Sequence, residues 1–312
     1  MKPPVILALP GNERLAAGLA AAMPAEAGRL TVHRFPDGES YVRIETPVAG
    51  RHVVLACTLH DPDSKLVPLV FAAATAKELG AARVGLVSPY LGYMRQDKRF
   101  QDGECISSIH FARLISGHLD WLATVDPHLH RHASLDEIFS IPGTIVHAAP
   151  LIAQWVRAHV PAPVVVGPDG ESEQWVSEVA RHAGAPWLVL EKTRRGDRDV
   201  SVSVPDAAAL RGRTPVLVDD IISTAHTMMA AARQLADGGG ARPVCIGVHA
   251  VFAGNAHAEL QAAGASRVVT VNTIPHASNA IDATDAIARA VAVMAAENRA
   301  SPTSQNRDTI EP

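Results

Sequence analysis

The chain has 312 residues, of which 47% are hydrophobic and 19% are charged, and its formal net charge is -4 at pH 7. At roughly 150 residues per domain, this length favours two domains with sizeable cores. A chain without a basic block is not expected to bind nucleic acid. No apolar segment approaches the ~20 residues of a membrane-spanning helix, and the three scattered cysteines have no metal-binding or disulfide spacing. We therefore expect a cytoplasmic location and no membrane partner.

Strand and helix patterns alternate along the first part of the chain. Apolar runs predict strands at 5–9, 30–35, 41–44, 53–57, 84–87 and 121–125. Helical periodicity predicts helices at 13–22, 63–79 and 107–116. The segment from Pro142 to Pro150 is interpreted as a hinge, after which the alternation restarts.

The second part repeats the same plan. Strands are predicted at 164–166, 187–190, 215–218, 244–250 and 268–271. Helices are predicted at 149–158, 173–183, 228–235, 256–262 and 281–297. The polar residues 298–312 are predicted to form a disordered tail. This alternation indicates the α/β class, with a mainly parallel sheet flanked by helices in each half.

The stretch 215–227 carries the strongest functional signal. A short apolar run ends in Asp219 and Asp220, and a small polar loop from Ser223 to Thr227 leads into a helix. In open α/β sheets, ligands bind beyond the carboxyl ends of the strands. Loop amides and the positive end of a helix suit a phosphate group. The two carboxylates would then face sugar hydroxyls or a magnesium ion.

An alternative interpretation of this stretch is purely structural. The two aspartates would then begin a turn, and the hydroxyl side chains would cap the helix that follows. The sequence contains no Gly-x-x-x-x-Gly-Lys-Ser/Thr segment, so the common nucleotide-binding P-loop does not account for the pattern.

Three further polar segments follow predicted strands. Residues 94–104 form either a solvated loop or a clamp whose cations bind a polyphosphate, with Gln96 able to read a base edge. Residues 126–132 carry three alternating histidines, but without a cysteine or a third fixed ligand zinc is disfavoured, and binding of a magnesium nucleotide by His128 is preferred. Residues 191–199 form either an exposed hairpin tip or a mobile cationic lid.

Taken together and in order, the motifs of the chain resemble those of ribose-phosphate pyrophosphokinases, the 5-phosphoribosyl 1-diphosphate (PRPP) synthetases. The resemblance runs from the first strand into the last helix. The Ile-Ile-Ser-Thr variant and the run 99–108 are more similar to the archaeal-type branch. The motifs are Phe35-Pro36-Asp37-Gly38-Glu39, Gly92-Tyr93-Met94-Arg95-Gln96-Asp97-Lys98, Asp126-Pro127-His128, Pro168-Asp169, Lys192-Thr193-Arg194, Val218-Asp219-Asp220-Ile221-Ile222-Ser223-Thr224 and Thr273-Ile274-Pro275-His276.

The resemblance implies two phosphoribosyltransferase-like domains with the active site between them. Residues 1–146 would carry the ATP-side loops, and residues 147–297 would carry the ribose 5-phosphate loop. The implied reaction transfers the β,γ-diphosphoryl group of MgATP to the C1 hydroxyl of ribose 5-phosphate, giving PRPP and AMP. The implied cofactor is Mg²⁺, and the implied active form is a homo-oligomer, a dimer or a hexamer, with a shared ATP site.

The resemblance also implies roles for individual residues, transferred by motif position. The catalytic cations would be Lys192 and Arg194, which close over the transferring group. ATP would be held by Arg95 and Gln96, together with Phe35, Asp37 and Glu39 of a neighbouring subunit. The magnesium nucleotide would be bound by His128 and Asp169. Ribose 5-phosphate would be bound by Asp219, Asp220, Ser223, Thr224, Ala225, His226 and Thr227.

Three positions depart from the family pattern. Ser223 stands where the family usually has aspartate, and His226 where it usually has glycine. The turn 170–172 replaces a glycine-rich or lysine-containing turn and introduces Glu171. These departures keep alternatives open: an active synthetase, a non-catalytic or regulatory paralogue, or a phosphoribosyltransferase that consumes PRPP.

Overall fold

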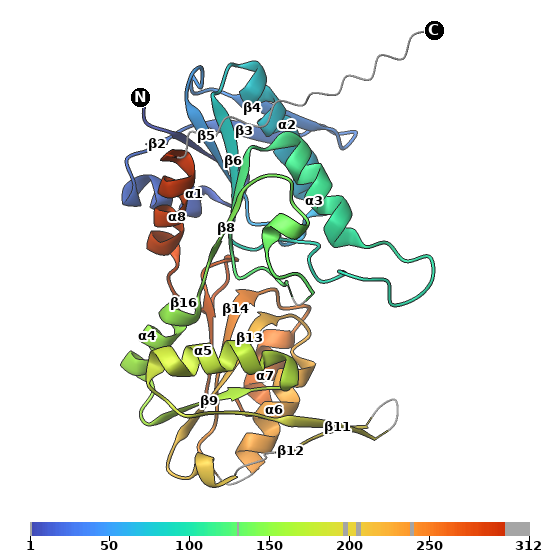
Figure 1. The fold of residues 1–312 in the computed structure, drawn as a ribbon, viewed down its shortest axis with the longest axis vertical. Coiled ribbons are helices and arrows are strands. Elements are labelled where there is room, and N and C mark those ends of the chain that lie inside the picture. The colour runs from blue at the N-terminus through green and yellow to red at the C-terminus, as the bar shows by residue number, and fades with distance from the viewer. Residues whose placement is uncertain (1, 130, 196–198, 204–206, 238–239, 297–312) are drawn as a thin grey trace.

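The computed structural model describes residues 2–129, 131–195, 199–203, 207–237 and 240–296. These residues form an upper and a lower half, each built on a six-stranded sheet (Figure 1). The predicted tail at 298–312 lies outside the described residues. Within them, no helix combines the length and the apolar character that a membrane-spanning helix requires.

The first sheet has the strand order β2-β1-β5-β6-β7-β8, and every pair in it is parallel. Its helices are α1 (Glu13–Ala22), α2 (Asp63–Glu78) and α3 (Ser107–His118). An antiparallel hairpin of β3 (Leu30–Arg34) and β4 (Ser40–Ile44) packs against α2. The strands of the sheet are β1 (Val5–Ala8), β2 (Glu26–Ala27), β5 (His52–Ala56), β6 (Arg83–Ser88), β7 (Trp121–Val125) and β8 (Gly143–Val146).

The second sheet repeats this plan, with the order β10-β9-β13-β14-β15-β16 and parallel pairing throughout. Its strands are β9 (Pro163–Gly167), β10 (Trp187–Val189), β13 (Thr214–Ile222), β14 (Val244–Ala250), β15 (Arg267–Val271) and β16 (Asn279–Ile281). Its helices are α4 (Ala149–His159), α5 (Glu173–Ala183), α6 (His226–Asp237) and α7 (Ala256–Ala262). An antiparallel hairpin of β11 (Glu191–Arg195) and β12 (Asp199–Ser203) projects from this half (Figure 1). The predicted α/β fold class is confirmed.

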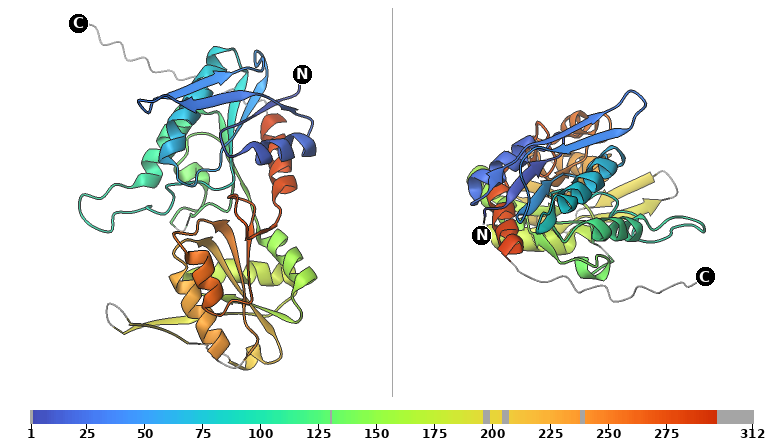
Figure 2. Two further views of the ribbon diagram at one scale, coloured as in Figure 1. Left: turned by 180° about the vertical axis from the view of Figure 1, so that it is seen from behind. Right: turned by 90° about the horizontal axis from the view of Figure 1, so that it is seen from above.

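The last helix, α8 (Thr284–Ala296), leaves the second half and packs on the first. It lies beside α1 in both Figure 1 and Figure 2, and it also contacts β7 and β8. Its buried residues Ile287 and Val291 belong to an apolar cluster that also contains Trp121 of the first sheet and Val218 of the second. The two halves therefore share part of their core, and the expected boundary between residues 146 and 147 stays a prediction.

The structure corrects several sequence-based expectations. The proposed hinge at 142–150 contains an edge strand, β8, and the last helix begins at Thr284 because residues 279–281 form β16. The strand predicted at 215–218 continues to Ile222, so the two aspartates lie inside β13 and not beyond its end. The reason is pairing: β14 continues alongside, with Gly247 opposite Asp219 and His249 opposite Ile221.

The close approach of β6 to β7 depends on a glycine. A Cβ atom added at Gly85 would lie 1.8 Å from Cε2 of Trp121, which is fully buried. We expect Gly85→Ala to lower the free energy of unfolding by at least about 2 kcal/mol, because the indole cannot move away in a packed core. Urea denaturation measures this change. The control is Gly117→Ala in α3, where the added methyl group meets open space and should stabilise by about 0.5–1 kcal/mol.

Candidate active site

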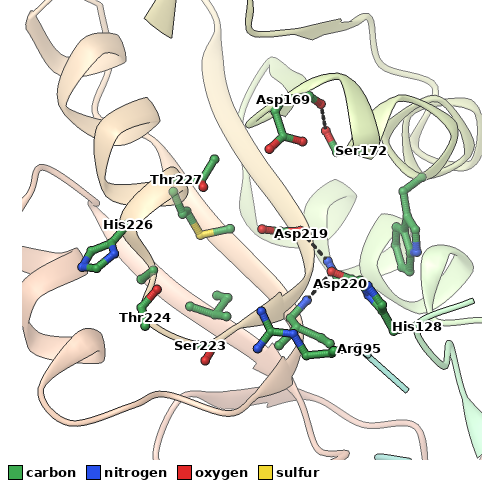
Figure 3. A pocket seen from close by; sticks show the side chains of 15 residues that line it. Arg95, His128, Asp169, Ser172, Asp219, Asp220, Ser223, Thr224, His226 and Thr227 are labelled. Carbon is green, nitrogen blue, oxygen red and sulfur yellow. Dashed lines mark hydrogen bonds and ion pairs between the residues drawn. The ribbon is translucent and has the colours of Figure 1, made fainter. Parts of the chain in front are cut away.

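A cavity of about 220 Å³ lies where the carboxyl ends of β9 and β13 meet loops of the first half. Figure 3 shows its side chains converging from both halves of the chain. Arg95 and His128 come from the first half, and all the other lining residues come from the second. The lining residues are Arg95, His128, Asp169, Ser172, Trp175, Asp219, Asp220, Ile221, Ile222, Ser223, Thr224, Ala225, His226, Thr227 and Met228.

A hydrogen-bonded pair joins the two halves across this cavity. Nδ1 of His128, three residues after β7, lies 2.7 Å from Oδ2 of Asp220 on β13. The other carboxylate oxygen of Asp220 accepts a hydrogen bond from the main-chain N–H of Ile221 at 2.7 Å. Asp219 accepts one from the N–H of Asp220 at 3.0 Å. These bonds fix both carboxylates against the strand.

The ionised form of Asp219 is disfavoured by its surroundings. Burial is the largest cause that raises its pKa well above the usual aspartate range, and the negative charges of Asp220 and Asp169 raise it further. A positively charged ligand beside these carboxylates would offset both effects. The site therefore favours a ligand that is a cation or that carries several hydrogen-bond donors.

The raised pKa of Asp219 predicts a pH-dependent stability change. Because the folded protein holds this proton more tightly than the unfolded chain does, stability is lost as pH rises from about 4, the unfolded pKa, through the folded pKa. We expect Asp219→Asn to raise the urea midpoint of the ligand-free protein at pH 7.5, and to change it less at pH 4.5. An equal change at both pH values, or a lower midpoint at pH 7.5, would contradict the assignment of a buried charge.

The loop between β13 and α6 has the form of an anion-binding turn. Ala225 has a left-handed φ of 59°, and it directly precedes the twelve-residue helix α6. Its neighbours are braced by the next loop, since the N–H of Phe252 donates to the carbonyl of Ile222 at 2.8 Å and that of Ala253 to the carbonyl of Ser223 at 3.1 Å. The first amides of a helix lack intrahelical acceptors and point at an incoming anion, such as a phosphate group.

The two unusual residues of this loop occupy different places. Ser223 is partly buried, whereas His226 is the first residue of α6 and is exposed. Figure 3 shows the His226 ring on the far side of the loop from Asp219 and Asp220. The imidazole therefore lies at the outer edge of the cavity and leaves the space beside the two carboxylates open.

The predicted ATP-binding residues of the first half separate in space. Arg95 is exposed and lines the cavity. Gln96 instead holds the start of α3, because its Oε1 accepts a hydrogen bond from the Ser107 hydroxyl at 3.1 Å and its carbonyl accepts one from the Ser108 N–H at 3.3 Å. It does not line the cavity.

The residues Phe35, Asp37 and Glu39 also lie away from the cavity. They occupy the turn between β3 and β4, and all three are exposed. A carboxylate oxygen of Asp37 accepts the N–H of Glu39 at 3.1 Å, which closes the turn. These residues do not reach the cavity of their own chain.

The basic segment 191–199, interpreted from the sequence as an exposed hairpin tip or a mobile cationic lid, includes strand β11, which forms an antiparallel hairpin with β12. Lys192 and Arg194 belong to β11, opposite Val202 and Val200 of β12. Strand periodicity places positions 192 and 194 on one face of this hairpin. The tip at 196–198 lies outside the described residues, as do the side chains of both cations.

Several lining residues were not singled out from the sequence. Ser172 caps the turn after β9, where its hydroxyl donates to the carbonyl of Asp169, and Trp175 lies one helical turn further on. The signal for Ser172 was its spacing of three residues from Asp169. Trp175 and Met228 carry ordinary helical periodicity, so nothing in the sequence marked them as part of a site.

The acidic residues of the cavity suit a magnesium ion, which does not need a complete set of protein ligands. Within the described residues, no group of three or more His, Cys, Asp or Glu side chains has the geometry to hold a metal ion. Mg²⁺ commonly keeps several waters and binds one or two carboxylates together with substrate phosphates. Asp169, Asp219 and Asp220 line one cavity and supply such carboxylates.

Comparison with protein families covers most of the chain. Residues 4–118 match the N-terminal domain of ribose phosphate pyrophosphokinase, and residues 134–288 match the phosphoribosyl transferase domain. The chain is therefore a protein with two domains of phosphoribosyltransferase type.

Curated relatives narrow this class. The chain is 34% identical over 289 residues to a ribose-phosphate pyrophosphokinase of Methanopyrus kandleri, with 92% of this chain and 98% of the relative covered. It is 34% identical to the Halobacterium salinarum protein of the same name, with 92% and 100% covered. The chain belongs to the ribose-phosphate pyrophosphokinase family. The predicted resemblance to archaeal members is confirmed.

A solved structure supports the fold. The phosphoribosylpyrophosphate synthetase of Mycobacterium smegmatis superposes with a TM-score of 0.81 at 24% identity, covering 94% of this chain and 99% of that one. The two-domain arrangement of parallel sheets flanked by helices is thus shared with that protein.

Proposed function

We propose that the protein is a ribose-phosphate diphosphokinase (EC 2.7.6.1), which transfers the β,γ-diphosphoryl group of MgATP to the C1 hydroxyl of ribose 5-phosphate. The products are PRPP and AMP. The observation that carries this proposal is the cavity itself: twin carboxylates and an anion-binding turn from one half face an arginine and a histidine from the other. Family membership over most of the chain supports it.

Ribose 5-phosphate is bound by the second half. The loop from Ser223 to Thr227 and the start of α6 hold the phosphate through main-chain N–H groups and hydroxyls. The sugar hydroxyls donate to the carboxylates of Asp219 and Asp220. Because ribose 5-phosphate is bound both at its phosphate and at its hydroxyls, the C1 oxygen is held in one orientation. This lowers the entropic part of the activation free energy.

The nucleotide is bound from the first half. Arg95 contacts its phosphates, and the neighbouring Gln96 supports this side of the site from outside the cavity, through its bond to Ser107 at the start of α3. Phe35, Asp37 and Glu39 reach the ATP of a neighbouring subunit, and their exposure and their position outside the cavity of their own chain support this role. The active form is then a homo-oligomer with a shared ATP site.

The proposed cofactor is Mg²⁺, which His128 and Asp169 would hold together with the nucleotide, in the cavity that Asp219 and Asp220 also line. When bound, the ion neutralises charge on the phosphate oxygens. Lys192 and Arg194 place two positive charges over the group in transit. Such charges act where negative charge develops in the transition state, and phosphoryl transfer depends chiefly on them and on positioning. The C1 oxygen attacks the β-phosphorus and loses its hydroxyl proton to solvent, and the bond between the β-phosphorus and the oxygen that bridges it to the α-phosphorus breaks, so that AMP leaves.

The location is proposed to be the cytoplasm. Cys57, Cys105 and Cys245 are all free, and the first and last of these are buried within separate cores. Burial raises the pKa of both buried thiols to about 12, which keeps them unreactive. Such an arrangement suits a reducing compartment.

The decisive experiment incubates the purified chain with MgATP and ribose 5-phosphate and measures AMP and PRPP together. Equal amounts of the two products are expected. No AMP with any donor or sugar phosphate of a small panel would favour a non-catalytic paralogue. Formation of a nucleotide from PRPP and a free base, without ATP binding, would favour a phosphoribosyltransferase.

A further inference from the structure

A second histidine joins the two halves, and it lies outside the cavity. His249 lies near the carboxyl end of β14, opposite Ile221 of β13, and only 1% of its surface is exposed. Its Nε2 lies 3.2 Å from the main-chain carbonyl of Asp126, in the first half, and its Nδ1 lies 2.9 Å from the hydroxyl of Thr273. It does not line the cavity, so the roles proposed above leave it unused.

The surroundings of His249 define which nitrogen carries the proton. Burial lowers the pKa of His249, so the ring is neutral. A main-chain carbonyl only accepts hydrogen bonds, so Nε2 must donate to Asp126 and Nδ1 must accept from the Thr273 hydroxyl. The Thr273 hydroxyl also donates to the carbonyl of Val248 at 2.9 Å, so its single proton is shared between that carbonyl and the ring nitrogen.

Asp126 is held in an unusual conformation by these contacts. Its φ is 30°, which lies in the region that residues other than glycine rarely adopt. Its carboxylate accepts the N–H of Ala148 at 2.7 Å and contacts Nδ1 of His147 at 2.9 Å. The side chain is thus tied to the segment that enters α4, while the carbonyl is tied to His249. A strained residue persists only where its surroundings hold it on several sides.

Asp126 is two residues before His128. The short segment between them is therefore fixed to the second sheet at both ends: Asp126 to His249 on β14, and His128 to Asp220 on the adjacent strand β13. If the first attachment is lost, Val146 and Ala148 still hold the N–H and the carboxylate of Asp126, but its carbonyl, from which the chain continues to His128, loses the donor of His249.

His249 is also held through Thr273 and Tyr90. The Thr273 carbonyl accepts a hydrogen bond from the Thr58 hydroxyl of the first half at 2.6 Å. That hydroxyl oxygen accepts the N–H of Tyr90 at 3.2 Å, and the ring of Tyr90 packs edge-to-face on His249 with the centroids 4.9 Å apart. His249 therefore lies between Tyr90 and Asp126, two first-half residues that contact its ring directly.

We propose that His249 is a positioning residue that sets the placement of His128 against Asp220, and through it the alignment of the nucleotide side with the sugar side of the cavity. This inference rests on the proposed function. The bond that matters is the one from Nε2 to the Asp126 carbonyl, because Asp126 begins the short segment that carries His128.

Substitution of His249 by glutamine or by asparagine distinguishes the bond to Asp126 from the other contacts of the ring. The amide nitrogen of glutamine reaches about as far as Nε2, whereas that of asparagine reaches only about as far as Nδ1. His249→Gln should keep the donor to Asp126 and retain kcat within about threefold of the parent. His249→Asn and His249→Leu should lower kcat by about 10–100-fold, as expected for loss of a supporting hydrogen bond, with a smaller change in the KM of ribose 5-phosphate.

A double-mutant cycle with His128→Ala tests the route of the effect. If His249 acts through His128, adding His249→Leu to His128→Ala should lower kcat by less than about twofold. Independent, multiplying effects would overturn the proposal, as would equal activity of the Gln, Asn and Leu variants at matched folded fractions measured by urea denaturation. Absence of AMP from the parent chain would instead remove the proposed function. In that case, hydrogen exchange at residues 126–129 still tests the attachment: faster exchange in His249→Leu than in His249→Gln supports it, and equal rates overturn it.

Discussion

Replacing Lys192 with alanine is expected to lower kcat by about 10²–10³-fold while the Kd of MgATP changes by less than about threefold. The reason is that a cation over the transferring group acts mainly on charge that develops in the transition state. Steady-state kinetics gives kcat, and equilibrium titration with a non-hydrolysable MgATP analogue gives the Kd. The two quantities must be measured on the same preparation.

The matched control for this prediction is Arg195→Ala. It removes a cation from the neighbourhood of Lys192, but strand periodicity places position 195 on the opposite face of β11 from positions 192 and 194. Its kcat should stay close to that of the parent. A collapse of MgATP affinity with unchanged kcat in the Lys192 variant would show that the residue binds ground-state nucleotide, and equal losses in both variants would indicate a general charge effect.

The second large effect is expected at Asp220. Asp220→Asn should lower kcat/KM for ribose 5-phosphate by about 100-fold or more, because it removes the charge that pairs with His128 across the two halves and that faces the sugar hydroxyls. The side chain keeps its size, so the fold should persist. Kinetics with ribose 5-phosphate as the varied substrate measures the loss.

The control for this variant is Asp282→Asn. Asp282 also follows a strand in the second half, but it bonds to Asn272 and Thr284 and lies outside the cavity. Its kcat/KM should remain near the parent value even if some stability is lost. Near-parental kcat/KM in the Asp220 variant would show that the twin carboxylates do not contact the sugar.

Most helices and strands could be predicted from periodicity, because each has an apolar face that is buried on one of two sheets. The helix at 173–183 and the strand at 244–250 have the predicted bounds. Edge strands such as β8 and β16 were missed because three or four residues are too few to show a period. The continuation of β13 through two aspartates was missed because neighbouring strands, not intrinsic propensity, stabilise it.

Many residues of the candidate site could be identified from polar segments at strand ends. These segments give residue types in sequence order, and the parallel sheet gathers the ends of its strands at one edge. The sequence could not indicate which polar side chains bond to each other instead of facing the cavity, as Gln96 does with Ser107. His249 gave no signal, because a single histidine in an apolar strand is usually a satisfied core residue, and its bond to Asp126 depends on how the two halves meet.

The packing of α8 on the first half has a consequence for protein synthesis. Ile287 and Val291 are buried against a sheet that was translated nearly 140 residues earlier, counting from the end of β8 at Val146 to Thr284. The amino-terminal sheet therefore leaves the ribosome with the surface that contacts α8 still uncovered. This surface is buried only after the last helix has been synthesised. Fragments that stop before residue 284 should expose this surface and associate with one another or with chaperones.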